Sequence, residues 1–170
     1  MPRATASTSS NLNERVQHEP HHELHFVRRV TTIFDGCEEA VVQAIESASS
    51  VVACVAWLTN AKLLRAMRRT PSRAVITSDP VHRRMATKLR QLREVRIVGT
   101  ARGRFRPLMH CKFLVGFDAT QTPQFVIMGS FNFTLHSTRN LEAMVRIDDE
   151  GVATAFYEEW KHIREISRPL

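Results

Sequence analysis

The sequence predicts an α/β domain in which a mixed, mostly parallel sheet lies between layers of helices. Hydrophobic residues at strand spacing alternate along the chain with hydrophobic residues at helical spacing. Residues 51–58 form a continuous Val-rich apolar run, which is typical of a strand buried on both faces. The length of 170 residues fits one globular domain, and a 43% hydrophobic content is enough to build its core.

The individual elements follow from this alternation. Residues 1–22 are polar and predict a flexible tail, and residues 23–170 predict a single domain. Asn60 is a suitable N-cap for a helix that Pro71 ends, and helical spacing indicates three further helices. The expected helices span residues 36–47, 61–69, 81–92 and 152–166. The expected strands span residues 26–34, 51–58, 73–77, 95–98, 111–117, 125–128 and 143–147.

Charge is unevenly distributed along the chain. Lys and Arg number 24 against 17 Asp and Glu, which gives a net charge of +7. Residues 61–106 alone contain fourteen basic and two acidic residues. Such a segment predicts a polyanionic partner, with nucleic acid (DNA or RNA) favoured over a membrane surface. The alternative is a solvated, arginine-rich surface without a partner.

Three cysteines, Cys37, Cys54 and Cys111, form an odd set without the spacing of a metal site or a disulfide framework. This usage indicates a reducing compartment, and we expect a cytoplasmic protein. The longest apolar run is far shorter than the roughly 20 residues that span a bilayer, so no stable membrane insertion is expected. The N-terminal residues lack the apolar core of a secretory signal.

Polar side chains form three pairs at i, i+2 spacing next to predicted strands. Because side chains alternate between the two faces of a strand, the members of each pair share one side, and Cys111 points to the other. Gly129, which precedes the second pair, lets the backbone approach a neighbour closely. The pairs are His110 with Lys112, Ser130 with Asn132, and Asn140 with Glu142.

These groups suit phosphodiester chemistry. A neutral imidazole can attack phosphorus and form a covalent phosphohistidine. Ammonium, hydroxyl and amide groups can bind the non-bridging oxygens, and a carboxylate can fix the imidazole tautomer. Taken singly, each pair is common, and Ser or Asn after Gly often only forms a turn. The combination predicts an active site.

The same residues resemble a known signature. His110-x-Lys112, Asp118, the hexapeptide GSFNFT at residues 129–134 and Asn140-x-Glu142 are similar to the HKD motif of the phospholipase D superfamily. The resemblance covers residues 26–166 and is closest to small bacterial nucleases with one motif per chain. It implies a phospholipase D-like catalytic domain that needs no metal or cofactor.

Roles of single residues also follow from the resemblance. It implies that His110 is the nucleophile, that Lys112, Ser130 and Asn132 bind phosphate, and that Glu142 orients the histidine. Because family enzymes use two motifs, one motif per chain implies a homodimer with a single shared active site. In that site, one His110 attacks and the partner's His110 protonates the leaving oxygen.

One departure from the family pattern concerns the strand after His110. Five residues, rather than the usual four, separate Lys112 from Asp118. We therefore expect either a bulge in this strand or Phe117 at the position that the family gives to the acidic residue.

Residues around the motif predict how substrate is held. The basic loop 101–107 leads directly to the motif, and a second loop follows GSFNFT. Phe105 or Trp57 could stack on a base, although core packing is the preferred interpretation for Trp57. The expected substrate-binding residues are Arg102, Arg104, Arg106, His136 and Arg139.

The predicted function is a metal-independent phosphodiesterase, an endonuclease that hydrolyses nucleic acid through a phosphohistidine. Two alternatives stay open at this point. One is a phospholipase or phosphatidyl transferase, since an anionic lipid also carries a phosphodiester. The other is a catalytically silent nucleic-acid-binding module.

Overall fold

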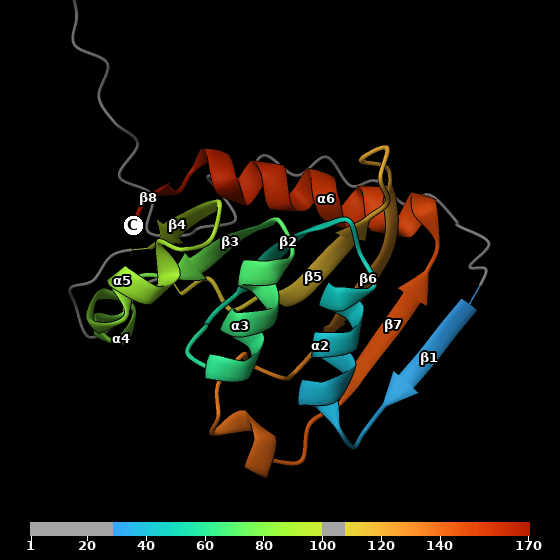
Figure 1. Ribbon diagram of the computed structural model, residues 1–170, viewed down its shortest axis with the longest axis horizontal. Coiled ribbons are helices and arrows are strands. Elements are labelled where there is room, and N and C mark those ends of the chain that lie inside the picture. Colours follow the sequence, from blue (N-terminus) through green and yellow to red (C-terminus); the bar gives the residue numbers. More distant parts are fainter. Residues whose placement is uncertain (1–28, 100–107) are drawn as a thin grey trace, which may run out of the picture.

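The computed structural model describes residues 29–99 and 108–170 (Figure 1). The predicted tail, residues 1–22, lies outside the described residues, as does the basic loop 101–107. The described helices are α2 (Cys37–Glu46), α3 (Ala61–Arg69), α4 (Pro80–Arg84), α5 (Ala86–Leu89), α6 (Glu150–Glu165) and the 3-10 helix η1 (Ser137–Arg139). The strands are β1 (Arg29–Ile33), β2 (Ser50–Val55), β3 (Ser72–Thr77), β4 (Glu94–Val98), β5 (Lys112–Phe117), β6 (Pro123–Gly129), β7 (Met144–Asp148) and β8 (Arg168–Pro169).

The strands form one mixed sheet in the order β1-β7-β6-β5-β2-β3-β4-β8. The α/β class and the mixed sheet are confirmed. The expected predominance of parallel pairs is wrong, because only β2–β3 and β3–β4 are parallel and the other five described pairs are antiparallel. For β5 and β6 the reason is the short connection between them, because a parallel pair needs a crossover of a dozen or more residues.

Helices cover both faces of the sheet, as expected. Helices α2 and α3 lie on one face and α6 on the other (Figure 1). The side chains of β2 alternate between the two cores: Val51 and Ala53 pack toward α2 and α3, whereas Val52 and Cys54 pack toward α6. Every residue of β2 is buried, which explains its continuous apolar sequence.

One predicted helix is divided in the structure, and short elements are present that the sequence did not predict. The predicted helix at residues 81–92 is divided into α4 and α5 at Met85. His82 is directed inward there: its Nδ1 donates to the Thr77 carbonyl (2.8 Å), and its Nε2 accepts from the Leu58 amide (3.2 Å). A buried histidine on this turn replaces the regular apolar stripe of one long helix. The short strand β8, which pairs with β4, was not predicted, and neither was the 3-10 helix η1.

The strands that carry the polar motifs begin or end at the same edge of the sheet, which is the edge formed by strand ends and not by an outermost strand. Lys112 at the start of β5 pairs with Val55 at the end of β2, and Gly129 at the end of β6 pairs with Met144 at the start of β7. We call this the catalytic edge, because the residues predicted to form an active site lie on it. None of the helices in residues 29–99 and 108–170 is long and apolar enough to cross a membrane.

Candidate active site

His110 lies at the catalytic edge, two residues before β5, and its side chain is exposed. Its ring meets the Trp57 ring edge to face, with 5.7 Å between the centroids. Trp57 follows the end of β2, and its indole Nε1 donates to Asp79 Oδ2 at 3.4 Å. One side of the imidazole therefore packs against the Trp57 ring, which Asp79 holds in place, and the other side is open to solvent.

Lys112 is buried on the face of the sheet that α2 and α3 cover. Its Nζ donates to the His110 carbonyl at 2.8 Å, so the ammonium holds the backbone that carries the imidazole. Burial lowers the pKa of Lys112, and the nearby Cys111 and Glu142 oppose this shift by favouring the charged form. Lys112 is thus an ammonium within electrostatic reach of both His110 and Glu142.

Cys111 points to the opposite face, as strand alternation predicts. It packs with Cys54 and Met128 in the core beneath α6. A thiol on that face cannot reach the space in front of His110, so the site is not arranged for thiol catalysis.

The backbone at Gly129 brings the second and third motif pairs together. A Cβ atom at Gly129 would lie 2.1 Å from the Ala143 carbonyl oxygen, so only glycine allows this approach. The Ser130 amide donates to that carbonyl (2.9 Å), and the Ser130 hydroxyl accepts from the Ala143 amide (3.1 Å). The Ser130 hydroxyl in turn donates to the Glu142 carboxylate. Asn140 Nδ2 donates to the same carboxylate at 3.1 Å.

The segment after Ser130 alternates between core and site. Phe131 and Phe133 are fully buried, and Asn132 lies between them. Asn132 Oδ1 is buried without a hydrogen-bond partner among the described residues. Because an amide oxygen accepts hydrogen bonds, any partner of Asn132 Oδ1 must be a donor.

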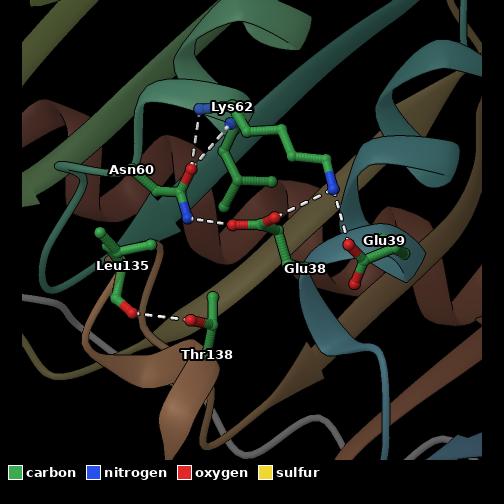
Figure 2. Close-up of polar contacts among 7 residues, drawn as sticks. Glu38, Glu39, Asn60, Lys62, Leu135 and Thr138 are labelled. Atoms are coloured by element: carbon green, nitrogen blue, oxygen red, sulfur yellow. Dashed lines mark hydrogen bonds and ion pairs between the residues drawn. The ribbon is translucent and has the colours of Figure 1, made fainter.

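The N-terminus of α3 anchors this segment to α2 and α3, the two helices on one face of the sheet. The Phe133 carbonyl accepts from the amides of Thr59 (2.8 Å) and Asn60 (2.9 Å). Figure 2 shows Asn60 capping α3 through its Oδ1 and donating from its Nδ2 to Glu38 of α2. Lys62 also pairs with Glu38 at 3.0 Å. The capped helix, the acidic end of α2 and the GSFNFT segment therefore hold one another in place.

The electrostatics of the site favour a neutral imidazole. The surrounding protein removes part of the hydration of His110, and the Lys112 ammonium repels a second positive charge; both effects lower the pKa of His110. An imidazole must be unprotonated to attack phosphorus, so these shifts extend its active range to more acidic pH.

Replacing Lys112 by methionine is expected to raise the pKa of His110, because the repelling charge is removed while the apolar stem is kept. The pKa stays below its ordinary value, since burial is the larger cause of the shift. Titration of His110 by NMR measures this directly. Lys161→Met on α6 is the control and leaves the midpoint unchanged; a midpoint in Lys112→Met that is unchanged or lower would contradict the assignment.

Comparison with known proteins places this geometry in a family. A family model described as "Cardiolipin synthase, PLD-like domain" matches residues 22–164. The chain belongs to the phospholipase D superfamily. No curated protein matches the sequence.

Solved structures share the phospholipase D-like fold. Nuc, a phospholipase D family member from Salmonella typhimurium, aligns with a TM-score of 0.68 at 20% identity, over 84% of this chain and 97% of that one. NucT from Helicobacter pylori aligns with a TM-score of 0.67 at 13% identity, over 84% and 99%. TrmBL2, an archaeal chromatin protein described as showing a novel mode of DNA binding, aligns with a TM-score of 0.57 at 16% identity, over 84% and 55%.

The superfamily pattern is altered at the far end of β5. Strand β5 pairs with β2 without interruption, so it carries no bulge on that side, and the register shift against β6 leaves Gln124 unpaired instead. Phe117, five residues after Lys112, is buried against Tyr157 of α6 with 4.9 Å between the ring centroids. Asp118 accepts from the amides of Thr120 and Thr122 (both 2.9 Å) and closes the hairpin. Of the two expected alternatives, β5 itself contains no bulge, and Phe117 and Asp118 both lie at the end of the strand away from the catalytic edge.

The expected binding residues His136 and Arg139 lie in the connection between β6 and β7, which begins and ends at the catalytic edge. His136 and Arg139 are exposed on and before η1, and no hydrogen bond or ion pair joins their side chains to another described residue. Three expected residues and one expected stacking ring lie outside the described residues; these are Arg102, Arg104, Arg106 and Phe105.

Trp57 is the residue that sequence reasoning placed wrongly. It is half-buried beside His110 and is not part of either hydrophobic core. Its position at the end of a buried strand, on the edge where the motif pairs meet, was the available signal. This signal was missed because Trp57 continues the apolar run 51–58.

Apolar side chains surround the catalytic edge. Leu108 precedes His110, Leu141 precedes Glu142, and Phe34 follows the residue that pairs with Met144. With Leu135 after the GSFNFT segment, they are four of the five large hydrophobic side chains that are exposed in the described residues. Their exposed fractions are 67% for Phe34, 37% for Leu108, 62% for Leu135 and 104% for Leu141. Among the described residues, no group of three His, Cys, Asp or Glu side chains could hold a metal ion.

Proposed function

We propose that the protein is a phosphodiesterase that cleaves nucleic acid, DNA or RNA, through a covalent phosphohistidine at His110. The observation that carries this proposal is the convergence of His110, Lys112, Ser130 and Glu142 at one edge of the sheet, with the pKa of His110 lowered toward the neutral, nucleophilic form. The attack is made by a side chain, so the proposed reaction requires no metal or cofactor.

The proposed reaction has two steps. The neutral His110 nitrogen forms a bond to phosphorus, the bond to the leaving ester oxygen breaks, and the partner's His110 gives that oxygen a proton. Water then attacks the phosphohistidine, the partner's His110 takes its proton, and the phosphorus–nitrogen bond breaks. The two histidines titrate as a coupled pair, one neutral and one charged at the start of the cycle.

The remaining groups bind the phosphate in this proposal. Lys112 neutralises the charge on the non-bridging oxygens, and Asn132 would donate to one of them from its Nδ2. Ser130 would exchange its bond to Glu142 for one to the phosphate. No hydrogen bond joins Glu142 to His110 within the described chain, so an orienting contact between them would form across the proposed dimer.

Charge supports a polynucleotide substrate. Several basic residues of α3, α4 and α5, the helices that follow β2 and β3 in the chain, form no ion pair with another described residue. An unpaired basic surface attracts a phosphate backbone and releases counterions from it. These unpaired residues are Arg65, Arg83, Arg84 and Lys88. The similarity to TrmBL2, described as binding DNA, points the same way.

A second candidate is a phospholipase or phosphatidyl transferase. The exposed apolar residues at the catalytic edge favour it, because such a rim could meet lipid as well as protein. The matching family model, named for cardiolipin synthase, also favours it.

The substrate experiment compares labelled single- and double-stranded DNA and RNA with anionic phospholipid vesicles, all in excess EDTA. We expect the full chain to cleave at least one of the polynucleotides and to leave the phospholipids intact. Cleavage of phospholipid alone would establish the second candidate. Binding of polynucleotide without hydrolysis of either substrate would establish the catalytically silent module instead.

The homodimer is proposed to form through the apolar residues at the catalytic edge. Leu135→Glu combined with Leu141→Glu is expected to convert a dimer to a monomer and to lower activity at least tenfold, since each site would lack its second histidine. Sedimentation velocity and activity are measured together. Val30→Glu, on exposed β1 away from this edge, is the control and keeps the dimer. A double variant that stays dimeric and active would reject this interface.

A further inference from the structure

A hollow lies beside the catalytic edge, between α4, α5 and β8. The cavity has a volume of about 400 Å³, within the range of small-ligand sites. The charged side chains that line it are three arginines, Arg83, Arg90 and Arg168, and one carboxylate, Asp79. Figure 1 shows the three elements grouped at one end of the sheet.

The cavity and His110 share the same sheet edge. Strand β3 runs parallel to β2, so the residues after β3, Ser78 and Asp79, emerge on the side where Trp57 follows β2. Two contacts then connect the cavity wall to the nucleophile. Asp79 accepts from the Trp57 indole at 3.4 Å, and the Trp57 ring meets the His110 ring.

The polar groups in the cavity wall are held in place by the fold. His82 bonds through both ring nitrogens, donating to Thr77 and accepting from Leu58, which fixes it as a neutral imidazole. Asp79 accepts from the Val81 amide at 2.8 Å with one oxygen and from Trp57 with the other. The Asp79 carboxylate therefore caps α4 and holds the Trp57 indole in position.

The arginines give the cavity its net positive charge. Arg90 donates to the Leu170 backbone oxygen at 3.2 Å through Nη2, which holds the segment after β8 against α5. Arg83 and Arg168 are exposed and form no ion pair with any other residue in the described ranges. Guanidinium groups bind phosphate oxygens in a bidentate manner, so two unpaired ones at one cavity favour a phosphate.

We propose that this cavity binds a phosphate of the same polynucleotide strand, one that flanks the phosphodiester held at His110. The inference rests on the proposed function and deepens it: the strand runs from the catalytic edge, past the Trp57 ring, to Arg83 and Arg168. Trp57 lies between the two phosphate positions, where an aromatic ring can stack on a base.

Binding is tested in the full chain with His110→Ala, so that a bound strand stays intact. The cavity variant adds Arg83→Ala and Arg168→Ala. The control variant adds Arg69→Ala and Arg93→Ala, which remove the same charge from exposed positions that do not line the cavity and that lie next to the starts of β3 and β4, at the opposite end of these strands from the catalytic edge. The probe is a fluorescent single-stranded oligonucleotide, and its Kd is measured by fluorescence anisotropy over a range of salt concentrations.

The cavity variant is expected to raise Kd about tenfold and to reduce the slope of log K against log salt by roughly 0.7, the value for one lost phosphate contact on a single strand. The control variant is expected to change Kd less than about twofold. Equal weakening in the two variants would overturn the proposal in favour of a diffuse basic surface. Failure of the parent protein to bind the oligonucleotide would also overturn it.

A vesicle arm identifies the source of the phosphate. If the cavity variant loses binding to anionic phospholipid vesicles but keeps oligonucleotide binding, the cavity holds a lipid headgroup and the proposal fails.

The outcomes for the cavity can be distinguished from those for the proposed function. Cavity-dependent oligonucleotide binding by a chain with an intact His110 that does not cleave would reject the nuclease alone, whereas cleavage with equal Kd in both variants would reject the cavity alone.

Discussion

Replacing His110 by alanine is expected to abolish hydrolysis, with kcat reduced by about 10⁴-fold or more, as for the loss of a covalent nucleophile. No other described side chain can take over its role, because Cys111 lies on the opposite face and Lys112 is bonded to the His110 carbonyl. Initial rates on the preferred polynucleotide, with excess enzyme and in EDTA, measure the loss.

The matched control for this variant is His162→Ala, which removes an exposed histidine on α6. It is expected to retain full activity. Because the His110 side chain is exposed, its removal leaves both cores intact, and the variant should unfold at the wild-type temperature. A folded His110→Ala protein with more than about a tenth of wild-type activity would mean that another group attacks phosphorus.

Replacing Gly129 by alanine is expected to destabilise the protein by about 3 kcal/mol or more. The added Cβ would lie 2.1 Å from the Ala143 carbonyl oxygen and 2.7 Å from Met144 Cα, and both are backbone atoms that cannot turn away. Strands β6 and β7 would have to separate at the point where Ser130 bonds to Glu142. Chemical denaturation measures the loss, and activity is expected to fall with it.

Gly151→Ala provides the comparison for this substitution. Gly151 lies in the first turn of α6, where alanine favours the helix by up to about 1 kcal/mol. The two variants add the same methyl group, so their difference isolates the close approach of β6 to β7. A Gly129→Ala protein as stable as the wild type would show that the two strands are not packed at this distance.

The sequence was sufficient to place the motif residues because the i, i+2 rule depends only on strand geometry. His110 and Lys112 share one side and Cys111 the other, as the alternation requires. Trp57 could not be placed in the same way. Whether a residue at the end of a buried strand enters the core or faces a site depends on its neighbours in space, here Asp79 and His110.

The layers and most elements also followed from hydrophobic periodicity, which reports the exposure of a residue but not its strand partner. The proportion of parallel pairs was therefore wrong, although the seven residues between the predicted strands 111–117 and 125–128 were already too few for a crossover. The division of the helix at Met85 was hidden for a related reason. His82 takes part in two hydrogen bonds to other segments, and no local pattern shows them.

The central claim is that His110 attacks phosphorus, and trapping the intermediate tests it most directly. The protein is mixed with an end-labelled oligonucleotide, quenched within milliseconds in alkali, which preserves phosphohistidine, and digested for mass spectrometry. The account predicts a nucleotide-derived phosphoryl adduct on the peptide that contains His110. It predicts no such adduct in the Lys112→Met protein, which lacks the ammonium that binds the phosphate. Rapid cleavage without an adduct on His110, or an adduct on another residue, would contradict it.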